Sequence, residues 1–232
     1  MKSAIINNIN TYVPESRNEL IDFALKNNKI LIGINAEKIL HSKHNLKDLI
    51  NNNIGYPDGI GAVMALRKKG IDTAFKIPGC ELWLDIIKTY YKEKSFYLIG
   101  GDETTIQSTV KKLKEEFIGI NIRNYRNGYF KGNDEKESLI EDIIKHKPDV
   151  IFVAMGSPTQ EYLMESIHNR YKAVYQGLGG SFDLYVGETK RAPKSWIKRN
   201  LEWAFRLLSQ PRRIKRQIHL IRFYLLLKLN KF

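Results

Sequence analysis

The strongest constraint on the fold of this chain is an alternation of short apolar runs with longer amphipathic segments. The short runs are apolar enough to form strands buried on both faces, and they cover residues 30–34, 96–100, 150–156 and 173–179. Between them, apolar residues recur at helical spacing over residues 17–28, 103–117 and 136–146. This pattern predicts βαβ units and therefore a Rossmann-like α/β fold, a mainly parallel sheet with helices on both faces.

Positive charge gathers at the carboxyl end of the chain. Residues 190–232 carry 13 Lys and Arg side chains against one acidic residue, Glu202, whereas the residues before them carry 25 basic and 24 acidic side chains. We therefore predict two domains, a nearly neutral α/β domain over residues 1–190 and a basic helical C-terminal appendage over residues 191–232. Such an appendage needs a polyanion or an anionic surface as its partner.

The composition also narrows the cellular setting. The only cysteine, Cys80, permits neither an internal disulfide nor a cysteine metal cluster, which fits a reducing compartment. The first residues lack the basic segment and long apolar core of a signal peptide. No run approaches the ~20 apolar residues of a transmembrane helix. These features lead us to expect a cytosolic protein.

Glycine-rich turns follow the predicted strands, where parallel sheets bind their ligands. These turns cover residues 33–38, 55–61, 99–105, 155–161 and 176–183. Glycine lets the backbone approach a ligand closely, and a helix N-terminus offers unpaired N–H groups to anions. None of the turns matches GxGxxG or GxxxxGK[ST], the fingerprints of dinucleotide and P-loop sites. The turns predict a nucleotide-type ligand bound in another way.

Motifs in these turns and in the appendage resemble those of one enzyme family. They are PDGIG (57–61), GSPTQE (156–161), GGSFD (179–183), RAPKSW (191–196), EWAFRL (202–207) and PRR (211–213). With these motifs in this order, residues 35–216 are similar to the WecG/TagA/CpsF family of bacterial glycosyltransferases, glycosyltransferase family 26.

The resemblance implies a reaction and its partners. It implies an inverting transfer, without metal or other cofactor, from a UDP-sugar donor to an undecaprenyl-diphosphate-linked sugar, with GlcNAc as the expected acceptor sugar. The donor sugar would be of the N-acetylmannosamine type; UDP-glucose, UDP-galactose and the uronic acid of UDP-ManNAc stay open as alternatives. The chain has no DxD motif, which agrees with a metal-free mechanism. The product would serve cell-surface polysaccharide or teichoic acid synthesis at the inner face of the bacterial membrane.

Asp58 is the predicted catalytic residue. An inverting transfer needs a base that takes the proton from the acceptor hydroxyl, and the resemblance assigns that role to this position. An aspartate ahead of a predicted helix over residues 59–69 is also typical of an N-cap. The two roles can coexist.

Asn35 and Gln160 are predicted to bind sugar hydroxyls. Asn35 at a strand exit is also typical of an Asx-turn, and the run from Ser157 to Gln160 is typical of a capping box with Pro158 at the first helical position. Family members often carry Thr-x-Asn where this chain has Gly33-Ile34-Asn35. The missing hydroxyl suggests a different sugar.

The turns supply the other predicted substrate-binding residues, which are Gly59, Gly61, Gly100, Gly101, Gly156, Ser157, Gly179, Gly180 and Phe182. Gly100 and Gly101 are expected to admit the nucleotide. Asp102 behind them would repel a diphosphate, so a contact with the ribose or the base is favoured there; a capped βα turn is the alternative. Phe182 would pack or stack at the pocket wall.

Arg191 of the appendage is a predicted substrate-binding residue, and Arg206, Arg213 and Arg216 are the residues predicted to bind phosphate. Guanidinium groups bind phosphates bidentately, and the leaving UDP or the acceptor diphosphate would be their target. A solvated basic face is the alternative.

Beyond Pro211 we predict a helix with Ile214, Ile218, Ile221 and Leu225 on one stripe, and residues 220–227 are apolar nearly all round. Such a helix suits an anionic membrane surface. This apolar stripe argues against nucleic acid as the partner of the basic segment, although a pI of 9.6 favours it. Homo-oligomerisation through the tail stays open.

Overall fold

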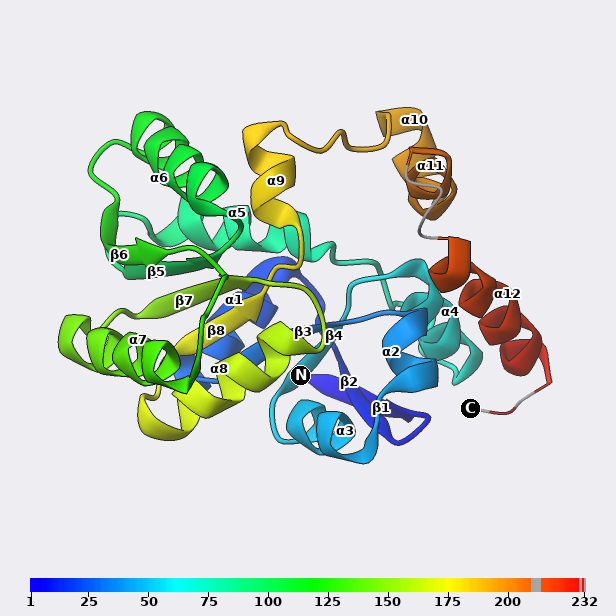
Figure 1. The fold of residues 1–232 in the computed structure, drawn as a ribbon. Helices are drawn as coiled ribbons and strands as arrows, with labels where there is room; N and C mark the ends of the chain where they lie inside the picture. Colours follow the sequence, from blue (N-terminus) through cyan, green and yellow to red (C-terminus); the bar gives the residue numbers. More distant parts are fainter. Residues whose placement is uncertain (210–213, 230, 232) are drawn as a thin grey trace.

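The chain is described here by a computed structural model that covers residues 1–209, 214–229 and 231. The side chains of Arg206, Ser209, Ile221 and residues 214–219 also lie outside the described part. Figure 1 shows the arrangement, in which helices lie on both sides of a central sheet.

Six parallel strands form the central sheet, in the order β4-β3-β8-β7-β5-β6. The strands are β3 (Ile30–Ile34), β4 (Ile54–Pro57), β5 (Ser95–Gly100), β6 (Asn121–Arg126), β7 (Val150–Ala154) and β8 (Val174–Gly177). The predicted Rossmann-like α/β fold and its four buried strands are confirmed. β4 is only four residues long, and β6 at the sheet edge has an exposed residue at every second position, so neither has a long apolar run.

Helices cover both faces of the sheet because each strand points alternate residues to opposite sides. On β7, Ile151 and Val153 belong to one core cluster, whereas Val150 and Phe152 belong to the other. The first cluster includes residues of α2 (Ala36–His41), α3 (His44–Asn51), α4 (Ile60–Lys68), α7 (Asn133–His146) and α8 (Thr159–Arg170). The second includes residues of α1 (Arg17–Asn27), α5 (Gly79–Tyr90), α6 (Glu103–Glu116) and α9 (Ser181–Val186).

A β-hairpin precedes this architecture. β1 (Lys2–Ile6) and β2 (Ile9–Val13) pair antiparallel as a separate two-stranded sheet. Asn7 and Asn8 at the turn have φ angles of 48° and 63°, as the common two-residue hairpin turn with two positive φ angles requires. Ile6 and Ile9 are fully buried and join the first core cluster.

The strand order places a topological switch point between β5 and β7. The chain leaves β5 toward β6 at the sheet edge, whereas it leaves β7 toward β8 in the opposite direction. Ligands of open α/β sheets bind outside the carboxyl ends of the strands at such a point. The turns after β5 and β7 contain Gly100, Gly101 and Gly156, so the topology and the predicted substrate-binding glycines coincide.

The appendage contributes three helices, α10 (Lys194–Lys198), α11 (Glu202–Ser209) and α12 (Ile214–Lys228). α12 packs against α2 and α4 (Figure 1). Its Phe223 and Leu227 are buried, and Lys68 of α4 donates from Nζ to the backbone carbonyls of Leu227 and Lys228. One side of the segment 220–227 is therefore covered by protein, whereas Tyr224 and Leu225 are exposed.

No helix within the described residues combines the length and the apolar character that a membrane crossing requires. The division of the chain at residue 190 stays a prediction.

Candidate active site

Asp58 lies at the carboxyl end of β4, beside the end of β3. Its backbone N–H donates to the carbonyl of Ile34 at 3.0 Å, which fixes the turn to the neighbouring strand. Its carboxylate Oδ1 accepts a hydrogen bond of 2.6 Å from the backbone N–H of Gly79, the first residue of α5. The N-cap of α4 is Gly59, without a side-chain cap bond. The prediction that Asp58 caps its own helix is therefore wrong, because its carboxylate serves the N-terminus of another helix.

The position of α5 explains why a carboxylate is stable at this point. The first N–H groups of a helix have no partner within the helix, and they carry the positive end of its dipole. The N-cap residue of α5 is Pro78, whose side chain forms no capping hydrogen bond. The Asp58 carboxylate, 21 residues earlier in the sequence, accepts the capping hydrogen bond instead, and this bond holds the side chain in one orientation.

Two glycines allow the turn that contains Asp58 to lie close to the turn after β3. A Cβ atom placed on Gly33 would lie 2.8 Å from the Cβ of Asp58 and 3.4 Å from its Oδ2. A Cβ atom placed on Gly59 would lie 3.0 Å from the Cβ of Asn35. The turns after β3 and β4 are thus in close contact, and the space that a threonine would need at position 33 is filled by the catalytic candidate itself.

Beneath Asp58 lies a buried polar pair that the sequence motifs do not include. Tyr56 and Gln176 are both fully buried, and Gln176 donates from Nε2 to the Tyr56 hydroxyl at 3.3 Å. Burial and then the charge of Asp58 raise the pKa of Tyr56, so the phenol stays protonated. A glutamine inside the apolar run AVYQG is the signal that could have identified this pair.

Asn35 is the N-cap of α2. Its side-chain oxygen accepts from the backbone N–H of Lys38, three residues on, at 2.9 Å. Asn35 therefore caps a helix and does not form the Asx-turn given as its alternative, in which the bond would reach the residue two positions on. Its contact with a substrate stays a prediction. The amide lies next to Gly59 and therefore close to the Asp58 turn.

Gln160 joins the turns after β7 and β8. Its side chain is buried, its Oε1 accepts from the N–H of Gly179 at 2.8 Å, and its Nε2 donates to Glu161 at 3.1 Å. The N-cap of α8 is Pro158, without a side-chain cap bond, so the predicted capping box with Pro158 at the first helical position is wrong.

The adjacent Glu161 extends this connection to the turn after β3. Glu161 forms an ion pair of 3.2 Å with Lys38 of α2, and both side chains are largely buried. Buried charges of this kind are stable only when they are paired. The turns after β3, β7 and β8 are therefore held at fixed distances from one another.

The turn after β5 is shaped by close contact with β7. Gly100 has a φ of 131°, and a Cβ there would collide with the carbonyl oxygen of Ala154. The N–H of Gly101 donates to the same carbonyl at 3.1 Å. Asp102 caps α6 by accepting from the N–H of Thr105 at 2.8 Å, which confirms the capped βα turn. Nucleotide binding by this turn stays a prediction.

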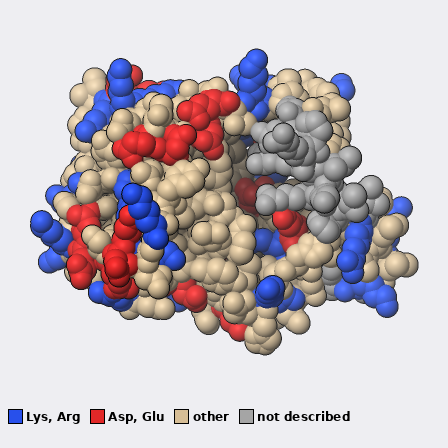
Figure 2. Space-filling view, viewed as in Figure 1, with Lys and Arg blue, Asp and Glu red and all other residues tan. Residues whose placement is uncertain are grey.

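Acidic side chains surround this turn. Thr105 donates from its hydroxyl to Glu188 at 3.0 Å. Burial, and then the charges of Glu188 and Asp102, raise the pKa of Asp183 at the start of α9. Figure 2 shows acidic side chains gathered in one patch over α6 and α9. Carboxylates at this point can accept hydrogen bonds from sugar hydroxyls but repel a diphosphate.

The remaining residues of the turn after β8 have different environments. Phe182 is fully buried and packs edge-on against Trp83, with ring centroids 5.6 Å apart, which is the packing alternative of its prediction. Gly179 and Gly156 have positive φ angles of 60° and 77°, and a Cβ atom added to either would meet open space. Gly61, by contrast, is buried between Ala36 and Phe223.

Arg191 is engaged within the protein. Its guanidinium pairs with Glu81 on α5, and Arg17 binds the other carboxylate oxygen of Glu81. Burial would raise the pKa of Glu81, but the hydrogen bonds from Arg191 and Arg17 lower it. The Arg213 residue and the side chains of Arg206 and Arg216 lie outside the described part, so their phosphate contacts stay predictions.

The appendage is fixed to α5 and to the segment that leads into it. Besides the pair of Arg191 and Glu81, Glu202 at the start of α11 forms a 3.4 Å ion pair with Lys76, and both side chains are mostly buried. Lys76 lies three residues before Gly79. The basic appendage therefore starts beside the helix end that holds Asp58.

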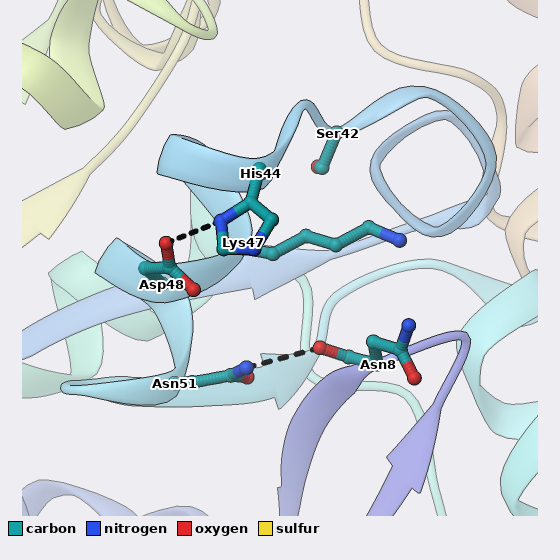
Figure 3. Close-up of a pocket in the computed structure, with 6 residues that line it drawn as sticks. All are labelled: Asn8, Ser42, His44, Lys47, Asp48 and Asn51. Atoms are coloured by element: carbon teal, nitrogen blue, oxygen red, sulfur yellow. Dashed lines mark hydrogen bonds and ion pairs between the residues drawn. The ribbon is translucent and has the colours of Figure 1, made fainter.

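A separate polar pocket lies away from this site. It has a volume of about 380 Å³ and is lined by Asn8, Ser42, His44, Lys47, Asp48 and Asn51 (Figure 3). None of the predicted site residues lines it. His44, which pairs with Asp48 there, is 93% exposed. Among the described residues, no group of three or more His, Cys, Asp or Glu side chains is placed to hold a metal ion.

A comparison with protein families decides the assignment. The model of the glycosyl transferase WecG/TagA/CpsF family matches residues 6–232, nearly the whole chain. The chain belongs to this family. It is therefore a glycosyltransferase that takes a sugar from a nucleotide-sugar donor, and its family acts in cell-surface polysaccharide or teichoic acid synthesis.

Replacement of Gly33 by alanine tests how tightly the site is built around Asp58. The new Cβ would displace the side chain of Asp58, the predicted base. We expect sugar transfer to fall by about 10- to 100-fold, because a base tolerates little displacement. Steady-state kinetics of the Gly33→Ala variant would measure this. Gly132→Ala is a matched control, since a Cβ there meets open space. Wild-type rates for Gly33→Ala would contradict this account of the site.

Proposed function

We propose that this glycosyltransferase inverts the anomeric centre, works without a metal ion and uses Asp58 as its general base. The observation that carries the proposal is the Asp58 carboxylate, partly accessible and held by the Gly79 N–H at the carboxyl edge of the sheet. In the reaction, an acceptor hydroxyl attacks the anomeric carbon and its proton passes to Asp58. The new C–O bond forms as the bond to the UDP phosphate oxygen breaks, and its electron pair leaves with UDP.

The turns suggest how the donor binds. The acidic residues Asp102, Asp183 and Glu188 would accept hydrogen bonds from the ribose hydroxyls, and Gly100 and Gly101 would let the nucleotide approach the sheet. The other candidate residues of the turns would surround the sugar and its phosphates: Asn35, Gly59, Gly156, Ser157, Gln160, Gly179 and Gly180. Gln160 would act through the fixed position of the Gly179 backbone.

The diphosphate would lie toward the appendage. Carboxylates line the turn after β5, whereas basic residues lie on α10 to α12, and a leaving diphosphate without a metal ion needs cationic groups to stabilise it. Arg206, Arg213 and Arg216 are the proposed partners, shared between UDP and the acceptor diphosphate. Because Arg191 is bound to Glu81, we assign it a role in fixing the appendage.

The acceptor would be an undecaprenyl-diphosphate-linked sugar, most simply GlcNAc, and the donor UDP-ManNAc or another UDP-hexose. The exposed apolar residues of the appendage support a peripheral position on the inner membrane face; they are Leu201, Trp203, Leu208, Tyr224, Leu225 and Leu229. Apolar side chains beside basic ones suit an anionic bilayer surface. A nucleic-acid ligand would not cover these exposed apolar side chains.

Substitution of Asp58 by asparagine distinguishes the role of Asp58 as a base from its structural role as a hydrogen-bond acceptor. The amide oxygen can still accept from Gly79, so we expect the same unfolding midpoint, whereas transfer should fall by about 10²- to 10⁴-fold because the proton acceptor is lost. Asp48→Asn, at an exposed aspartate of the separate pocket, should leave the rate unchanged. A purified Asp58→Asn enzyme with near-wild-type turnover would disprove the role.

Vesicle flotation tests the membrane surface. The full-length protein should float with vesicles containing phosphatidylglycerol, less so with neutral vesicles or at high salt, and should not shift DNA or RNA in a gel. The double variant Leu208→Glu and Leu225→Glu should float several-fold less. Ile118→Glu, which changes an even more exposed apolar residue just beyond α6, is the control. Nucleic-acid binding without flotation would favour the alternative function.

A further inference from the structure

Gln176 is a polar residue in the middle of the sheet. It lies on β8 between Leu31 of β3 and Phe152 of β7, and its side chain is fully buried. Burial of an amide is unfavourable unless hydrogen bonds replace those with water. The partners of this side chain therefore indicate what the glutamine does.

Both donor contacts of Gln176 lead to the neighbours of Asp58. Nε2 donates to the backbone carbonyl of Gly79 at 3.2 Å and to the hydroxyl of Tyr56 at 3.3 Å. The Gly79 carbonyl can only accept, so the amide must turn its NH₂ group toward it. In this orientation Oε1 is buried without a hydrogen-bond partner among the described residues.

Gly79 is held at both of its backbone groups. Its N–H donates to Asp58 Oδ1 at 2.6 Å, and its carbonyl accepts from Gln176. Its lack of a side chain matters, because a Cβ there would lie 3.0 Å from the Tyr56 hydroxyl oxygen and 3.4 Å from Asp58 Oδ1. Hydrogen bonds to Gln176 on one side and to Asp58 on the other thus fix the start of α5.

We propose that Gln176 is the positioning residue of the catalytic base: by fixing Gly79, it holds the N–H group that orients and stabilises the Asp58 carboxylate. The inference rests on the proposed role of Asp58. Gln176 itself has no contact with the substrate in this account, and it acts through α5. Tyr56 supports it by filling the space beside Gly79 and by accepting its second hydrogen bond.

Other ionisable groups lie nearby and must be kept constant in a test. Tyr56 on β4 lies two residues before Asp58 and is influenced by the charges of Asp58, Cys80 and Glu161. Cys80 follows Gly79 on α5, and Glu161 on α8 is paired with Lys38 on α2. Replacement of Gln176 by a neutral residue changes none of these charges.

The test compares the pH profile of kcat/KM with a direct titration of Asp58 in the Gln176→Met variant. A hydrogen bond to a carboxylate favours its charged form, so weakening the Gly79 contact should shift the acid limb upward by about one pH unit. The rate on that limb should fall about tenfold and recover as the pH rises. The ¹³C signal of the Asp58 carboxyl, assigned by its absence in Asp58→Asn, should titrate with the same upward shift.

A matched control is Asn53→Leu, which removes a buried amide with two backbone hydrogen bonds at the opposite end of β4. This variant should lower the stability of the protein without shifting the pH profile of kcat/KM or the ¹³C titration of Asp58. If Gln176→Met does not fold, Gln176→Asn serves instead, because its shorter amide cannot reach Gly79. An unshifted Asp58 titration in the folded variant overturns the inference. The Asp58 titration needs no turnover, so it tests the role of Gln176 independently of the proposed activity. The proposed role of Asp58 as the base fails if the Asp58→Asn enzyme remains active.

Discussion

The hydrogen bond between the Gly79 N–H and the Asp58 carboxylate is the contact on which the site depends. It joins the carboxyl end of β4 to the start of α5, two elements separated by about twenty residues. The helix end gains the acceptor that its own N-cap residue does not supply, and the carboxylate gains a fixed orientation at the edge of the sheet. One interaction thus caps α5 and orients the side chain that we propose as the base.

The rest of the site is arranged around this contact by two further connections. The ion pair of Lys38 and Glu161, continued through Gln160 to Gly179, holds the turns after β3, β7 and β8 together. On the other side of Asp58, ion pairs fix the appendage to α5 and to the segment before it. The start of the basic segment, at Arg191 and Glu202, is therefore in contact with the site region.

Much of the fold could be predicted from the sequence because buried parallel strands have continuous apolar runs. The central strands β3, β5, β7 and β8 have such runs. The short β4, the half-exposed β6 and the N-terminal hairpin do not, since their stability comes from neighbours that local periodicity cannot reveal. Three of the family motifs lie in turns that follow parallel strands, and the other three lie in the appendage.

The local roles of the site residues were harder to predict. Asp58 and Gln160 both precede or begin helices, and a local capping role was the alternative for both. Their side-chain oxygens instead accept from Gly79 and Gly179, about twenty residues away. Gln176 and Tyr56 were missed because the glutamine within an apolar run marks a buried polar residue but does not indicate its partner. In each case the partner is set by tertiary packing, which short-range sequence rules do not contain.

The measurement that tests the central claim most directly is UDP release by the full-length protein. A panel of UDP-sugars would be offered with and without a synthetic lipid-diphosphate-GlcNAc acceptor, in the presence of EDTA. The account predicts that at least one donor releases UDP, that release requires the acceptor, and that EDTA does not abolish it. The absence of UDP release with every pairing, or release that depends on an added metal ion, would contradict it.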